Sequence, residues 1–192
     1  ACIFRGTRGI SDEEIDLAAR YCLDFTTSGV PILLRREWND GSTNEELLLP
    51  RTIADYGKML FGEETKFLTH NWQHRDGSIR CNIAYFDTPG NGLQIGFVNG
   101  VWADTGIHMK AANSALWDKL HLNDDIKKYA PGATVADFKK HVSVLVLCFG
   151  TNPIQGGQVK TGLNNISNKG SFTIGDINED MANKMCTGKN AW

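Results

Sequence analysis

The stretch from Lys66 to Asp104 constrains the fold more than any other part of the chain. It contains the dipeptides Asp76-Gly77 and Asn99-Gly100, which tolerate the positive φ angles of a two-residue type I′ hairpin turn. A third turn is expected at Pro89-Gly90-Asn91-Gly92. Because the segments between these turns are rich in aromatic and β-branched residues, they predict a four-stranded antiparallel β-meander at about residues 66–104.

Helical signals lie on both sides of this meander. Ser11 and Glu14 have the spacing of a capping box, so a helix is expected from there until shortly before Gly29. The other expected elements are strands at 31–38, 142–149 and 171–174, and helices that begin after Pro50 and near 107, 134 and 177. Gly57 weakens the expectation of the helix after Pro50. Helices interrupt strands without regular βαβ alternation, which predicts an α+β fold in which further strands extend the meander and about three to five helices pack on it.

Composition is that of a globular chain. Of its 192 residues, 41% are hydrophobic and 22% are charged, close to ordinary averages. No repeat or linker divides it, so residues 1–192 are expected to form a single domain. The longest apolar run, 142–149, is far shorter than the ~20 residues of a membrane span. The net charge is −2, and the lack of a basic stripe argues against nucleic acid as a partner.

The cysteines and the first residues favour a secreted protein. The chain begins Ala1-Cys2 without a Met, as it would after removal of a signal peptide or after trimming, and it has five cysteines. Asn165-Ile166-Ser167 is a glycosylation sequon. Disulfides persist in oxidising compartments, so secretion is the expected localisation. An intracellular protein with reduced thiols is the alternative.

Two disulfide pairings are expected. Cys2 and Cys186 lie near the two chain ends, which often lie close together in folded domains. Cys22 pairs with Cys81 if the first helix packs on the meander. Cys148 lies within an apolar strand and is expected to be the free thiol, although connectivity cannot be deduced from sequence.

The first predicted hairpin brings a cysteine near two histidines. If Asp76-Gly77 forms its turn, Trp72 lies opposite Cys81, with His70 and His74 on the diagonals at about 7–8 Å. An adjacent imidazolium lowers the pKa of a thiol and can make it a nucleophile. Cys81 with His70 or His74 is therefore the catalytic candidate. The alternative is that Cys81 is a core residue or half of a disulfide, and that the histidines are structural.

The same two histidines do not predict a metal site. H-x-x-x-H spacing chelates zinc from a helix, but four residues along a strand span about 13 Å. No Glu lies between them, and no P-loop, dinucleotide fingerprint or metal-binding cysteine cluster is present. No metal and no cofactor are expected.

A short segment resembles a known enzyme family. Ile3-Phe4-Arg5-Gly6-Thr7-Arg8, followed by Glu13-Glu14-Ile15, is similar to the first strand of mono-ADP-ribosyltransferase toxins. The resemblance implies that Arg5 helps to hold NAD. It covers about a dozen positions. Thr26-Thr27-Ser28 comes too early for the family's Ser-Thr-Ser strand, and Glu179 lacks the partner two residues before it. The activity is therefore not carried over.

Three functional hypotheses follow. The first is a secreted toxin- or effector-like protein that acts by binding another protein or a cell-surface component, with exposed aromatic residues such as Trp38, Trp102 and Trp192 as anchors. The second is an enzyme, either a Cys–His hydrolase or a degenerate mono-ADP-ribosyltransferase. The third is a viral structural protein.

Overall fold

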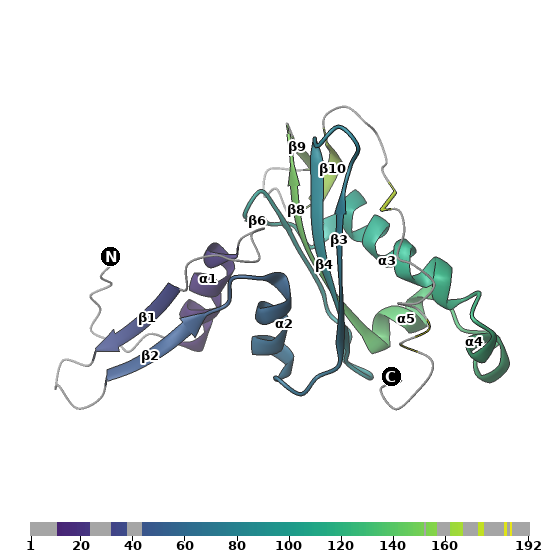
Figure 1. Cartoon of the computed structure of the whole chain (residues 1–192), viewed down its shortest axis with the longest axis horizontal. Coiled ribbons are helices and arrows are strands. Elements are labelled where there is room, and N and C mark those ends of the chain that lie inside the picture. Colours follow the sequence, from purple (N-terminus) through teal and green to yellow (C-terminus); the bar gives the residue numbers. More distant parts are fainter. Residues whose placement is uncertain are drawn as a thin grey trace.

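A five-stranded sheet with helices on both faces forms the centre of the molecule (Figure 1). The computed structural model describes residues 11–23, 32–37, 44–151, 153–156, 162–166 and 173–174, together with Asn183 and Met185. Helices α1 (Asp12–Cys22) and α2 (Ile53–Phe61) lie on one side of the sheet. Helices α3 (Ile107–Leu120) and α5 (Val135–His141) lie on the other side, and the short α4 (Asp124–Tyr129) follows α3.

The order of strands in the central sheet is β3-β4-β8-β5-β6. The strands are β3 (Phe67–Gln73), β4 (Ile79–Asp87), β5 (Gln94–Val98), β6 (Val101–Trp102) and β8 (Val142–Gly150). The two expected glycine turns are present, since Gly77 and Gly100 have positive φ and connect antiparallel pairs. However, β8 lies between β4 and β5 and pairs parallel with β5, so the meander is two hairpins separated by a later strand.

The position of β8 follows from its composition. Val142, Val144 and Val146 belong to the core cluster on the α3 side, whereas Leu145 and Leu147 belong to the cluster on the α2 side. A strand that is apolar on both faces can be buried only in the middle of a sheet. This confirms the expectation that the 142–149 strand is central.

The core on the α2 side requires a glycine in the helix. α2 begins at the cap Thr52, whose side chain accepts a hydrogen bond from the Asp55 backbone N–H. A Cβ atom at Gly57 would lie 2.1 Å from the ring of Phe86. Gly57 therefore permits close packing of α2 on β4, which explains why a residue unfavourable to helices occurs here.

The helix caps read from the sequence are confirmed. Ser11 and Glu14 form the capping box of α1, and Thr134 and Asp137 form a second one on α5. The helix at 107–120 is also confirmed as α3. Helix α4, capped by the Asn123 side chain, was not expected, because none of its residues is buried and its apolar periodicity is correspondingly weak.

Two smaller sheets complete the described structure. β1 (Ile32–Glu37) and β2 (Asn44–Leu49) form an antiparallel pair, seen at one end of the molecule in Figure 1. β7 (Thr105–Gly106), β9 (Pro153–Gly156) and β10 (Gly162–Ile166) form a three-stranded sheet in the order β7-β10-β9. Strands β2, β9 and β10 were not expected from the residue pattern.

The α+β class is confirmed. The strand expected at Ile3 lies outside the described residues, as does all but a small part of the elements expected at 171–174 and from 177 onward. Within the part of the chain that the structure describes, no helix has the length and apolar character needed to cross a bilayer.

Candidate functional site

The predicted register around Cys81 is confirmed, and the nearest reactive group to it is a second cysteine. Trp72 pairs with Cys81 across the β3–β4 hairpin, and His70 pairs with Ile83. On its other side Cys81 pairs with Cys148 of β8, and the two Sγ atoms lie 3.3 Å apart. Both residues are fully buried free thiols.

The surroundings of Cys81 favour the neutral thiol. Its hydrogen bond to Cys148 and its burial both raise the pKa of the Cys81 thiol well above the usual value. A nucleophilic cysteine requires the opposite shift, since the thiolate is the reactive form. The geometry therefore supports a packing role for Cys81.

The two histidines lie on the face that was expected to carry them. His74 is half-buried, its Nδ1 lies 2.7 Å from Oδ1 of Asp76, and its ring meets Trp72 edge to face at 6.1 Å between centroids. His70 is also half-buried, between exposed Thr69 and Asn71. Each imidazole is thus part of the hairpin's local structure.

The disulfide prediction is wrong for Cys81, because it is a free thiol beside Cys148. Antiparallel pairing of β4 with β8 brings these two residues together, and sequence reasoning placed Cys148 in a separate strand without a partner. Cys2, Cys186 and the side chain of Cys22 lie outside the described part of the chain.

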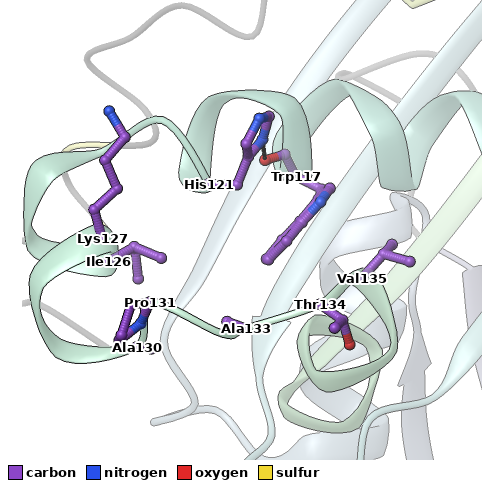
Figure 2. A pocket seen from close by; sticks show the side chains of 9 residues that line it. All are labelled: Trp117, His121, Ile126, Lys127, Ala130, Pro131, Ala133, Thr134 and Val135. Carbon is purple, nitrogen blue, oxygen red and sulfur yellow. Dashed lines mark hydrogen bonds between the residues drawn. The ribbon is translucent and has the colours of Figure 1, made fainter.

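A pocket of about 370 Å³ opens between the end of α3, α4 and the start of α5 (Figure 2). Trp117 and His121, one turn apart on α3, stack at 5.8 Å between ring centroids and form one wall. The remaining lining residues are Ile126, Lys127, Ala130, Pro131, Ala133, Thr134 and Val135. The sequence analysis missed this pocket, although an aromatic pair four residues apart on a helix was a readable signal.

The polar groups of this pocket already have partners within the protein. Nζ of Lys127 lies 3.7 Å from Oδ1 of Asp124. The Thr134 hydroxyl donates to Oδ2 of Asp137 at 2.7 Å, and this bond lowers the pKa of Asp137. Nδ1 of His121 lies 2.9 Å from the carbonyl oxygen of Trp117. The pocket therefore offers a ligand a mixed surface, with the rings of Trp117 and His121, aliphatic side chains, and the polar groups of Lys127 and Thr134.

A buried histidine lies where α3 begins. Nε2 of His108 lies 2.7 Å from the carbonyl oxygen of Ala103, and its Nδ1 has no hydrogen-bond partner among the described residues. Burial lowers the pKa of His108 to about 4. A Cβ at Gly96 would lie 2.6 Å from Nε2 of His108. Because β5 approaches so closely, this neutral imidazole is fixed between the sheet and α3.

A polar network on the opposite face joins α1 to the body of the molecule. The Tyr56 hydroxyl donates to Oδ1 of Asp16 at 2.7 Å and accepts from Nε of Arg20 at 3.0 Å. Arg20 is also ion-paired with Asp16, and its guanidinium lies 4.3 Å from the ring centroid of Trp102. Burial and the bond to Asp16 raise the pKa of Tyr56, so the phenol remains neutral and links the two helices.

No group of three or more His, Cys, Asp or Glu side chains suited to a metal ion occurs in the described ranges. The sites found among the described residues are a buried thiol pair, a pocket of mixed polarity, a neutral histidine and one interhelical network. None of them has the geometry of a complete catalytic centre. We therefore compared the overall fold with those of solved structures.

Solved structures with a similar fold are ATPase regions of gyrase and topoisomerases. The 43K ATPase domain of Thermus thermophilus gyrase B, in complex with an aminocoumarin, matches with a TM-score of 0.57 and 20% identity, over 81% of this chain and 43% of that chain. The ATPase region of Saccharomyces cerevisiae topoisomerase II matches with a TM-score of 0.54 and 19% identity, over 73% and 35%. The topoisomerase IV ATP binding domain of Francisella tularensis, in complex with a small molecule inhibitor, matches with a TM-score of 0.50 and 16% identity, over 87% and 43%.

The chain shares the fold of part of these ATPase regions. It spans less than half the length of each of the three solved structures. No protein-family model matches it, and no curated protein does either.

These similarities overturn the function predicted from the sequence. The secreted toxin- or effector-like protein that binds another protein or a cell surface is wrong, because the fold is one found in ATPase regions. That hypothesis was based on the chain start and the cysteine count, and the described cysteines Cys81 and Cys148 are reduced core residues. The hydrolase, ADP-ribosyltransferase and viral structural alternatives find no support in the fold, and Arg5 lies outside the described residues.

The expectation that nucleic acid is no partner is also withdrawn. It was based on the net charge of −2, which describes the surface of this chain alone. The matched ATPase regions are more than twice the length of the part that this chain covers. The net charge of this chain therefore does not exclude a nucleic-acid partner.

Proposed function

We propose that this chain is a segment of the ATPase region of a DNA topoisomerase, and that it contributes to ATP-dependent DNA processing as part of that larger region. The observation that carries the proposal is the shared fold, which extends over 81% of this chain in the comparison with the gyrase B domain. A bacterial gyrase, a bacterial topoisomerase IV and a yeast topoisomerase II provide matches of the same kind.

In this proposal the chain has a structural role, and the rest of the ATPase region encloses the nucleotide. Phosphate groups are usually bound by backbone N–H groups at glycine-rich helix N-termini. The pocket between α3, α4 and α5 lies at the start of α5, but no glycine lines it, and the capping box of Thr134 and Asp137 already uses backbone N–H groups there. It therefore differs from the glycine-rich helix N-terminus that a triphosphate usually occupies.

The packing of the central sheet suits a rigid structural part. β8 is buried on both faces, and the two helical layers pack on opposite sides of the sheet that contains it. Interiors packed in this way have low compressibility and transmit displacement. We infer that the segment keeps a rigid shape while the rest of the ATPase region binds and hydrolyses the nucleotide.

The proposal is tested with a chimera of the Thermus thermophilus gyrase B 43K domain in which this chain replaces the portion that it matches. Three proteins are compared in steady-state ATP hydrolysis: the chimera, the domain with that portion deleted, and the domain with an unrelated α+β protein of similar size in its place. We expect the chimera to hydrolyse ATP clearly faster than both controls. A chimera that folds but turns over no faster than either control contradicts the proposal.

A further inference from the structure

The β1–β2 hairpin is an incomplete sheet. Among the residues that the structure describes, β1 and β2 pair with each other and with no other strand, whereas the remaining strands belong to sheets of three or five. Within that described part, neither outer edge of the pair is hydrogen-bonded to a further strand. An isolated two-stranded hairpin is at best marginally stable in water, and open edges of this kind readily accept another strand.

The two faces of the hairpin differ in what covers them. Ile32, Leu34 and Leu49 pack against the core cluster on the α2 side of the central sheet. On the other face, Leu33 and Leu48 lie directly opposite each other and are 52% and 62% exposed. Two leucines paired in this way form a continuous apolar surface that nothing in the described structure covers.

The combination of this surface with free edges distinguishes the hairpin from other exposed apolar residues. Leu122 and Tyr129 are 57% and 75% exposed, but they lie beside and within helix α4, where no described strand edge accompanies them. Single exposed apolar side chains are normal on protein surfaces. At β1–β2 an apolar pair lies beside strand edges that no other described strand pairs with, and recognition by strand addition uses this combination.

We propose that the β1–β2 hairpin is the docking surface for the part of the ATPase region that this chain does not cover. That part supplies an extended segment, which pairs with a free edge of the hairpin and places apolar side chains over Leu33 and Leu48. The inference rests on the proposed function. The matched portion amounts to 43% of the gyrase B domain and 35% of the yeast ATPase region, so more than half of each region remains to contact this chain.

Hydrogen–deuterium exchange measured by mass spectrometry tests this docking surface in the chimera and in the isolated chain. In the isolated chain, the amides of 32–37 and 44–49 exchange much faster than those of β4 and β8. In the chimera we expect them to exchange at least about tenfold more slowly than in the isolated chain. Equal exchange of the hairpin in the two proteins overturns the proposal.

Variants identify the surface responsible. The double variant L33S/L48S, made in the chimera, should lose most of the added protection, while L122S, which changes an equally exposed leucine elsewhere, should keep it. Circular dichroism shows whether each variant is folded. Loss of protection in both variants, or in neither, contradicts the assignment to this face. If the isolated chain already protects the hairpin and sediments as a dimer, a second copy is the occupant and the proposal is wrong.

The outcome is separable from that of the proposed function. Protection of the hairpin in a chimera that does not hydrolyse ATP leaves the docking surface standing and removes the functional proposal. ATP hydrolysis by a chimera with an unprotected hairpin supports the functional proposal and contradicts the docking surface.

Discussion

Replacing Gly57 with alanine should destabilise the protein, although the same change stabilises most helices. At an exposed position in a helix, Gly→Ala adds about 1 kcal/mol to the free energy of unfolding. At Gly57 the new Cβ would lie 2.1 Å from Cε2 and 2.2 Å from Cζ of Phe86. That ring cannot easily move away, because it is buried between Phe61 and Phe67, at 5.2 and 5.3 Å between ring centroids.

The expected magnitude follows from these opposing effects. Overpacking of a close-packed core costs about 1–3 kcal/mol, which exceeds the helix-propensity gain. Because a separation of 2.1 Å requires a large displacement, we expect an overpacking cost of about 2–3 kcal/mol, so that G57A lowers the free energy of unfolding by about 1–2 kcal/mol. In an F86L background the ring is absent, so the same change should be neutral or stabilising. The coupling between the two sites should then be about 2 kcal/mol.

Urea unfolding followed by circular dichroism measures all four members of this cycle. S114A, at an exposed position of α3, serves as the control and should change stability by less than about 0.5 kcal/mol. If G57A unfolds at the same or a higher urea concentration than the original protein, Phe86 does not pack beneath α2 and the reasoning is refuted. A cycle with no coupling refutes it as well.

Three further predictions concern the buried polar groups. The pKa of His108 is lowered from 6.5 to about 4, so the unfolded state binds a proton at a higher pH than the folded state does. The free energy of unfolding should therefore fall by about 3 kcal/mol as the pH is lowered from 6.5 to 4. Urea titrations in which an H108N variant loses stability with pH as steeply as the original protein contradict this. Y56F removes a hydrogen bond to Asp16 and should lower the free energy of unfolding by about 1–2 kcal/mol. An unchanged melting temperature would contradict a stabilising role of the Tyr56–Asp16–Arg20 network. Cys81 is 0% exposed and its thiol pKa is raised. Iodoacetamide at pH 8 should therefore alkylate it at least about tenfold more slowly in the native chain than in urea, as measured by peptide mass spectrometry. Equal alkylation rates would show that the thiol is accessible.

Short-range residue patterns predicted the local structure correctly. Ser11 and Glu14 specify a capping box whatever lies elsewhere in the chain, and Asp76-Gly77 fixes both the turn and the register that places Trp72 opposite Cys81. Each of these interactions joins residues only a few positions apart, or strands connected by a tight turn. Such features can be read without knowledge of the rest of the fold.

Long-range pairing was beyond the same reasoning. The apolar pattern of β8 indicated a central strand, but nothing in it specified that β4 would be one neighbour and β5 the other, in parallel. That choice also decided the candidate site, because it brought Cys148 to Cys81. The small sheet of β7, β9 and β10 was missed because its strands are short and their surroundings are rich in glycine.

Function was the least predictable property, because no residue pattern in this chain carries it. Cysteine count and chain start led to a secreted toxin- or effector-like protein, whereas the arrangement of helices on a mixed sheet led to ATPase regions. Compositional arguments describe surfaces and compartments, and they do not specify a function, which depends on the chemistry of particular sites.

The most direct test of the account is the rate of ATP turnover when this chain occupies its matched position in the gyrase B 43K domain. The account predicts turnover that depends on ATP concentration in the usual saturable way and that vanishes when the chain is removed. A well-folded chimera whose turnover equals that of the domain lacking the segment would contradict it.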